Sequence, residues 1–353
     1  MMRVLSFLLA VAALLAFCSQ TFANSSPVVS NVTASQRSDD SKLVDIYYEL
    51  ADADSDNCTV WAFVSDDNGA SWRVPAWAFS GDVGSGISPG SKHIIWDAAT
   101  DIPGKIGDFK VRVYADDGNG TAPKVLVPGG SFPYQNTSNP DDWVYVDSFL
   151  IDKYEVTNQF YCQFLNATGW NDAWNSNMEI DRTGSDPNYV YTVQAGKENF
   201  PARYMNCYDA ENFCVWRSSL EGMTYRLPTE KEWEKAAAWD PVEKYYYLYG
   251  FHKDTVTSYL CNYFSSYIGT TTEVGHYDGS DGTQNAKSYY GCYDMSGNVR
   301  EWILNTGTNA RRRGGDFKSD GTVIQTSFLI AETSKTDRDE VTGFRCVMVP
   351  DSQ

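Results

Sequence analysis

Apolar and polar residues alternate along the first third of the chain in short runs, and turns rich in Asp, Asn and Gly separate these runs. Four runs alternate with the period of two that a half-buried strand requires: Val44 to Leu50, Thr59 to Ser65, His93 to Asp97 and Phe109 to Ala115. The turn residues between them tolerate positive backbone φ angles. Residues 24–122 are therefore predicted to form an all-β sandwich of immunoglobulin or fibronectin type.

The pattern changes near Pro123, where Gly, Pro and small residues interrupt the strands and Trp, Tyr and Asn become frequent. We place a domain boundary there and assign residues 123–353 to a second domain. After Ala238 regular signals are sparse while aromatic residues are dense, so loops packed by aromatic side chains should dominate. The expected class of the chain is α+β.

Three short helices are predicted in the second domain from their start and stop signals. The first lies within Glu155 to Gly169, with a polar start at Thr157 or Asn158 and a glycine stop. The second begins at Asn206, where an amide side chain can cap the helix. The third follows Thr229, which has a glutamate three residues later and so predicts a capping box.

The N-terminus is typical of an export signal. Arg3 precedes an apolar run from Val4 to Phe17, and Thr21 to Ala23 resembles a cleavage site, so residues 1–23 are predicted to be a signal peptide. A membrane anchor would need roughly 20 apolar residues. A lipid on Cys18 would normally need a small residue before it instead of Phe17. We expect a secreted or periplasmic protein whose mature chain has no transmembrane anchor.

Charge and cysteine content narrow the function. The chain has 46 acidic and 28 basic residues and a formal charge of −18. Such a surface repels nucleic acid and anionic membranes and favours hard cations such as Ca²⁺. One of the eight cysteines leaves with the signal peptide, so seven would enter an oxidising compartment that permits disulfides.

Four sequence blocks follow one another in the second domain. They are IDKYEVTNQFYCQFL (Ile151 to Leu165), YRLPTEKEWEKAA (Tyr225 to Ala237), GCYDMSGNVREW (Gly291 to Trp302), and RRGGDF with GFRC (Arg312 to Phe317, Gly343 to Cys346). In this order the blocks resemble the sulfatase-modifying-factor family, whose active members generate formylglycine. The resemblance implies a compact, loop-rich fold akin to C-type lectins for residues 123–353.

The third block offers a candidate metal site. Asp294 and Glu301 supply carboxylates, and the glycine-containing turn between them can aim backbone carbonyls at one point. In the family the matching positions bind a structural calcium ion through two side chains and two carbonyls. The resemblance assigns these roles to Asp294, Glu301, Gly297 and Val299. The alternative is a capped turn with solvated carboxylates.

The resemblance implies two further features. A second family calcium site uses an Asn side chain and the next carbonyl, which match Asn262 and Tyr263, although serine stands near the position of a later family aspartate. A family disulfide matches Cys214 and Cys346, with free buried thiols as the alternative. Cys261 and Cys292 could also pair, but sequence alone leaves connectivity open.

The family's oxidation chemistry lacks its ligands in this chain. Active members hold copper with two cysteine thiolates between RGGS and GFR, and soft Cu(I) selects sulfur. Here the segment from Asp316 to Thr342 has no cysteine and no histidine. In addition, Asp316 replaces the usual Ser and Arg300 replaces the usual Trp of GNVWEW. Copper is therefore not expected.

Iron-dependent relatives use three histidines, and this chain has only His93, His252 and His276, without a metal-binding spacing. We expect each of these histidines to be a surface or packing residue.

The sequence thus favours an exported, calcium-stabilised, non-oxidase binding module for a peptide or a glycan. The alternative hypothesis is a formylglycine-generating oxidase-like enzyme that acts on a cysteine of exported sulfatases with unrecognised ligands, for which Cys207, Cys261 or Cys292 are candidates.

Overall fold

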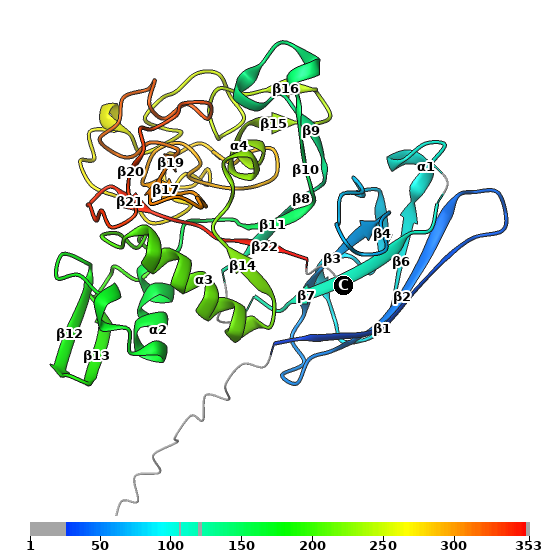
Figure 1. Ribbon diagram of the computed structural model, residues 1–353, viewed down its shortest axis with the longest axis horizontal. Helices are drawn as coiled ribbons and strands as arrows, with labels where there is room; N and C mark the ends of the chain where they lie inside the picture. The colour runs from blue at the N-terminus through cyan, green and yellow to red at the C-terminus, as the bar shows by residue number, and fades with distance from the viewer. Residues whose placement is uncertain (1–25, 106, 119–121, 351–353) are drawn as a thin grey trace, which may run out of the picture.

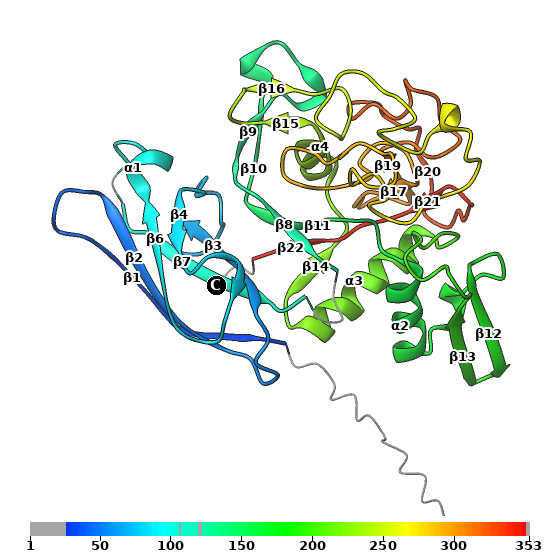
Figure 2. The same ribbon diagram turned by 180° about the vertical axis from the view of Figure 1, so that it is seen from behind.

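The computed structural model describes residues 26–105, 107–118 and 122–350, so the predicted signal peptide at residues 1–23 lies outside the described residues. Figure 1 shows two lobes, with strands β1 to β7 in one and the later elements in the other. Figure 2 shows the same two lobes from behind, with the sheet that contains β8, β11, β14 and β22 near their junction.

The N-terminal lobe consists of two antiparallel sheets. One has the order β1-β2-β6-β4 and the other the order β5-β3-β7. The four strands predicted from sequence are confirmed as β2, β3, β6 and β7. The bounds are β1 Val28–Gln36, β2 Leu43–Ala51, β3 Cys58–Ser65, β4 Phe79–Gly81, β5 Gly84–Ile87, β6 Gly90–Asp97, α1 Ala98–Asp101 and β7 Lys110–Asp116.

The two sheets share one hydrophobic core. Ile46 and Tyr48 of β2 and Trp96 of β6 point into it from one sheet, and Val60 of β3 and Val113 of β7 from the other. Alternate residues are buried in β2 and β6, as a two-layer arrangement requires, whereas β3 is buried at nearly every position. The lobe therefore has two packed sheets, and its assignment to an immunoglobulin or fibronectin type stays a prediction.

The C-terminal lobe is built around an antiparallel sheet with the order β14-β22-β11-β8, flanked by three helices. The bounds of these elements are β8 Lys124–Val127, β11 Phe149–Asp152, β14 Thr224–Arg226, β22 Val347–Val349, α2 Asn158–Thr168, α3 Cys207–Glu221 and α4 Glu230–Ala238. The lobe also has two hairpins, β9 Gly130–Phe132 with β10 Val144–Val146, and β12 Ile180–Ser185 with β13 Asn188–Val193, of which the second lies beside α2 (Figure 1).

All three predicted helices are confirmed, and their start signals act as expected. Thr157 caps α2 by accepting a hydrogen bond from the backbone N–H of Phe160, and Gly169 ends that helix in the left-handed conformation. Asn206 caps α3 and Thr229 caps α4, each within a reciprocal capping box.

Loops dominate the chain after α4, as predicted. Its regular elements are strands of two or three residues, namely β15 Trp239–Asp240, β16 Tyr245–Tyr246, β17 Arg300–Trp302, β18 Asn309–Ala310, β19 Arg312–Arg313, β20 Thr333–Ser334 and β21 Thr342–Gly343. The C-terminal lobe also has short 3-10 turns. Three precede α4, at Tyr134–Asn136, Pro140–Asp142 and Asn171–Ala173, and one follows it, at Phe264–Ser266. Buried aromatic rings such as Trp233 and Trp302 fill the space between the loops.

The two lobes are packed against each other. Trp61, Phe63 and Trp72 of the N-terminal lobe belong to the same hydrophobic cluster as Leu150 of β11. The boundary predicted near Pro123 falls between β7 and β8. In the described part of the chain, no helix has both the length and the apolar run that crossing a bilayer requires.

Candidate functional site

The block GCYDMSGNVREW forms a tight buried loop that leads into β17. Asp294 and Asn298 adopt positive φ angles of 59° and 58°. Gly297 has φ 90°, and a Cβ added there would lie 2.3 Å from the backbone oxygen of Asn262. Only glycine fits this close approach without displacing backbone.

Glu301 extends from β17 into the protein interior and is fully buried there. Both of its carboxylate oxygens accept hydrogen bonds from Arg345, at 2.8 Å from Nε and 2.7 Å from Nη2. Trp233 Nε1 donates to the same carboxylate at 2.8 Å. Glu301 therefore stands in a bidentate ion pair with Arg345, and its oxygens already have partners.

Asp294 lies beside a second buried carboxylate, Glu155. Oδ2 of Asp294 accepts a hydrogen bond from the N–H of Gly275 at 2.6 Å, and burial raises the pKa of Asp294 to about 6. Asn298 Nδ2 donates to Oε1 of Glu155 at 3.1 Å. Burial, followed by the charge of Asp294, raises the pKa of Glu155 well above its ordinary value.

Oε2 of Glu155 is buried and has no hydrogen-bond partner among the described residues. A buried carboxylate oxygen without a partner is costly unless a proton or a cation is shared. Glu155 was not predicted as a site residue, although it lies inside the IDKYEVTNQFYCQFL block. Its partner Asp294 is 139 positions later, so only the folded chain brings the two together.

The structure also places Asn262 and Tyr263 next to this loop. The backbone oxygen of Asn262 accepts from Asn298 N–H at 2.8 Å. Ser266 Oγ lies 3.0 Å from Asn262 Oδ1 and 2.7 Å from the carbonyl oxygen of Tyr263. The serine hydroxyl therefore contacts both oxygens that the family resemblance assigns to a second cation. Val299 is fully buried and packs close to Gly343.

These contacts test whether the residues fit a calcium ion. Asp294 and Glu155 place two buried carboxyl groups side by side, and one oxygen of Glu155 has no hydrogen-bond partner among the described residues, so either a shared proton or a cation would satisfy them. Oε2 of Glu301 accepts hydrogen bonds from Arg345 and Trp233, and Oε1 accepts one from Arg345, so the assignment of Glu301 as a calcium ligand stays a prediction. Ser266 Oγ contacts the oxygens of Asn262 and Tyr263, but its single proton can be donated to only one of them at a time, so their assignment to a second cation stays a prediction.

Arg300 and Asp316, the two departures from the family pattern, contact each other. Arg300 Nε donates to Asp316 Oδ2 at 2.7 Å, and Nη2 donates to the same oxygen. Ser319 Oγ also donates to this oxygen, and the N–H of Lys318 donates to Oδ1 at 2.8 Å. The carboxylate of Asp316 is fully buried.

The seven described cysteines are all buried and unbonded in the structure. Sγ of Cys214 in α3 lies 3.5 Å from Sγ of Cys346 beside β22, so the two thiols are neighbours and their disulfide stays a prediction. Burial raises the pKa of the thiols of Cys207, Cys261 and Cys292 above the ordinary value, which disfavours the reactive thiolate.

An exposed apolar loop borders the Arg300–Asp316 pair. Phe264 N–H donates to the carbonyl oxygen of Ser319 at 3.0 Å, which anchors the loop to the Asp316 turn. The side chains of Phe264, Tyr267 and Ile268 project into solvent, with exposed fractions of 62%, 86% and 43%. Rings this exposed contribute little to the core.

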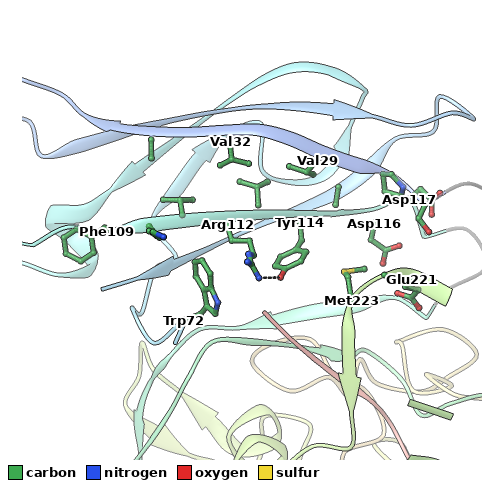
Figure 3. Close-up of a pocket in the computed structure, with 18 residues that line it drawn as sticks. Val29, Val32, Trp72, Phe109, Arg112, Tyr114, Asp116, Asp117, Glu221 and Met223 are labelled. Carbon is green, nitrogen blue, oxygen red and sulfur yellow. Dashed lines mark hydrogen bonds between the residues drawn. The ribbon is translucent and has the colours of Figure 1, made fainter. Parts of the chain in front are cut away.

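A cavity of about 690 Å³ lies at the junction between the lobes. Figure 3 shows Val29 and Val32 of β1, Arg112 and Tyr114 of β7, and Met223 after α3 around it. Arg112 Nη1 donates to the Tyr114 hydroxyl at 3.2 Å. None of the lining residues belongs to the GCYDMSGNVREW block, so this cavity is a feature of the lobe junction.

Comparison with known proteins identifies the family. The sulfatase-modifying factor enzyme 1-like domain matches residues 112–349, which is more than half of the chain. The protein therefore belongs to the sulfatase-modifying-factor, or formylglycine-generating enzyme, family. The match begins within β7 and covers all four sequence blocks.

The individual relatives have low sequence identity to this chain. The formylglycine-generating enzyme of Thermomonospora curvata is 24% identical over 289 residues, which cover 64% of this chain and 93% of that enzyme. The hercynine oxygenase of Mycolicibacterium smegmatis is 26% identical over 205 residues, or 50% of this chain and 44% of that protein. The chaperone protein LppX of Paenibacillus barcinonensis is 30% identical over 198 residues, or 50% of this chain and 69% of that protein.

Among solved structures, the crystal structure of CarF superposes with a TM-score of 0.51 at 21% identity, covering 65% of this chain and 99% of CarF. This likeness confirms the fold of the C-terminal lobe. It says nothing about activity.

Proposed function

We propose that this protein is an exported, non-oxidase member of its family that binds an extended peptide on the surface beside Arg300 and Asp316. The ion pair between these two residues is the observation that carries the proposal. It lies at the two positions where the chain departs from the family's usual Trp and Ser, and it buries a carboxylate there.

Loss of the copper ligands supports the non-oxidase part of the proposal. The segment from Asp316 to Thr342 supplies no thiolate and no imidazole. Its carboxylates and hydroxyls are hard ligands, which suit Cu(I) poorly. The carboxylate of Asp316 already accepts hydrogen bonds from Arg300, from Ser319 and from the backbone N–H of Lys318.

The neighbouring surface supports binding. Phe264 and Tyr267 expose two rings beside the Asp316 turn, and flat rings stack well on an extended ligand. Lys318, in the Asp316 turn, forms an exposed ion pair with Glu340. Aromatic rings next to charges of both signs favour a peptide over a glycan, because a peptide offers both apolar and charged partners.

Calcium binding is a further part of the proposal. Asp294 and Glu155 would hold the ion, because they place two buried hard oxygen donors together and leave Glu155 Oε2 without a partner in the described chain. The ion would neutralise like charges that otherwise repel in the interior. Glu301 would orient the loop through Arg345.

Binding can be tested with a random-peptide display library and a glycan array, using the purified protein as bait. Peptides selected by the protein should bind at least tenfold more weakly to the double variant Phe264→Ala, Tyr267→Asn. Asparagine is chosen because Tyr267 has φ 60°, which Asn tolerates. The control Val242→Ala removes an equally exposed apolar side chain from the β15–β16 turn and should leave affinity unchanged.

The proposal that this surface binds a peptide would be refuted if the protein selected glycans alone. It would also be refuted if the double variant and the wild type bound the selected peptides equally. Circular dichroism and melting temperatures must match among the variants, so that a loss of binding reports on the surface.

A further inference from the structure

Three potential metal ligands meet outside the family blocks. One ligand atom from each of Asp240, Glu243 and His252 lies within 4.8 Å of the others. Asp240 ends β15, Glu243 lies in the turn to β16, and His252 follows in the next loop. His252 was expected to be a surface or packing residue, because the histidines of the chain have no metal-binding spacing.

The carboxylate of Asp240 is held in one orientation. Its Oδ1 accepts hydrogen bonds from the N–H of Val242 at 2.8 Å and of Glu243 at 3.0 Å. Its Oδ2 lies 2.9 Å from Nε2 of His252. The side chain of Asp240 is 3% exposed, so this oxygen is directed from the interior toward the imidazole.

The imidazole and the second carboxylate are also held by neighbours. The ring of His252 lies 4.1 Å from the ring of Tyr247 and 6.1 Å from that of Tyr289, measured between ring centres. The Tyr247 hydroxyl donates to Oε2 of Glu243 at 2.6 Å. Hydrogen bonds and packing of this kind are what orient metal ligands in proteins.

We propose that Asp240, Glu243 and His252 bind a divalent first-row transition metal ion of the Zn²⁺ type. One imidazole nitrogen and two carboxylate oxygens form a donor set that zinc accepts, and the imidazole disfavours Ca²⁺ and Mg²⁺. Two zinc ligands at roughly 2.0 to 2.1 Å lie about 3 Å apart when their bonds are near a right angle. At the tetrahedral angle that zinc prefers, the separation is about 3.3 to 3.4 Å. Nε2 of His252 and Oδ2 of Asp240 lie 2.9 Å apart in a hydrogen bond. They would therefore move apart by about 0.4 Å as the ion replaces the proton between them.

Three protein ligands would leave the metal an open position. A pocket of about 300 Å³ adjoins His252 and is lined by Lys253, Lys287 and Tyr289 among others. An open zinc site accepts water or a ligand oxygen in its fourth position. The contact between Asp240 and His252 links the β15–β16 segment to the loop of His252. A bound ion would strengthen this link.

The test uses purified protein treated with chelator and then titrated with Zn²⁺ by calorimetry, and with Co²⁺ to follow its visible d–d absorption. We expect one zinc per chain with a dissociation constant below about 1 μM, which corresponds to roughly 8 kcal/mol. The Co²⁺ spectrum should shift on binding because imidazole enters the coordination shell. An excess of Ca²⁺ should not compete.

Two variants and a control locate the site. His252→Asn tolerates the positive φ of 59° at this position, and Glu243→Gln alters an exposed side chain. Each should raise the zinc dissociation constant at least tenfold, while His276→Asn should not change it. No binding, or binding that neither variant weakens, would overturn the proposal.

Discussion

Arg300 and Asp316 form an ion pair in which Nε and Nη2 of the arginine both donate to one buried carboxylate oxygen. Because Asp316 is fully buried, its charge depends on this arginine and on Ser319 for compensation. The pair holds the turn of Asp316 against β17. A backbone hydrogen bond from Phe264 to Ser319 anchors the exposed loop of Phe264 to this turn.

Removing one member of this pair should destabilise the protein. Arg300→Met leaves a buried carboxylate without its cation, so the free energy of unfolding should fall by about 3 kcal/mol. Urea denaturation of the wild type and the variant measures this change. Adding Asp316→Asn to Arg300→Met should restore at least half of the loss.

The exposed pair of Lys318 and Glu340 provides a matched control. Lys318→Met should change stability by less than about 0.5 kcal/mol, because solvent-exposed ion pairs contribute little. If Arg300→Met costs no more than Lys318→Met, the buried pair has no structural role.

Calcium should stabilise the protein through Asp294 and Glu155. At a concentration a hundredfold above its dissociation constant, calcium should raise the unfolding free energy by about 2.7 kcal/mol, and chelation should reverse the gain. Asp294→Asn should abolish this response, while Asp281→Asn, which changes an exposed carboxylate, should keep it. A wild type that melts at the same temperature in calcium and in chelator would exclude the ion.

Stability should depend on pH through Lys235. Burial lowers its pKa to about 7, and its ammonium contacts the carbonyl oxygens of Pro128 and Gly130. An unfolded lysine has a pKa of about 10.4, so between pH ~7 and ~10 the unfolded chain binds more protons than the native one. Stability therefore rises with pH across this window, by up to about 1.4 kcal/mol per pH unit from this group.

The measurement is urea denaturation at several pH values for the wild type and two variants. Lys235→Met should show a flatter rise between pH 7 and 10, whereas Lys231→Met, on the exposed side of α4, should follow the wild type. Parallel curves for all three proteins would show that Lys235 keeps an ordinary pKa in the native state.

Cys214 and Cys346 should form a disulfide in protein isolated from an oxidising compartment. Their sulfur atoms are neighbours at 3.5 Å, and the bond would close a loop of more than 100 residues, which could contribute roughly 4 kcal/mol. Peptide mapping without reductant should find the two cysteines linked, with Cys207 free. Alkylation of both residues in denatured, unreduced protein would contradict the prediction.

Local signals made much of the fold predictable. The caps at Thr157, Asn206 and Thr229 act within three residues, so the sequence alone placed the starts of three helices. The alternation of apolar and polar residues is also a local signal, and it predicted β2, β3, β6 and β7. By contrast, β1 was not predicted. Most of its side chains are exposed to solvent and none is fully buried.

The site was predicted only in part, because its contacts are distant in sequence. Asp294 was selected, but Glu155 is brought beside it by the fold alone. Arg300 and Asp316 were each recognised as departures, yet their ion pair depends on how two irregular loops meet. Glu301 was selected as a calcium ligand, but its ion pair with Arg345 was not predicted, because Arg345 lies in the distant GFRC block.

We propose that this family member does not oxidise cysteine. The most direct test incubates the purified protein with copper, O₂ and a peptide that carries the sulfatase motif Cys-X-Pro-X-Arg, beside the Thermomonospora curvata enzyme as a positive control. Mass spectrometry should find the peptide cysteine unchanged with this protein and converted by the control. Conversion that increases with the amount of this protein would contradict the account.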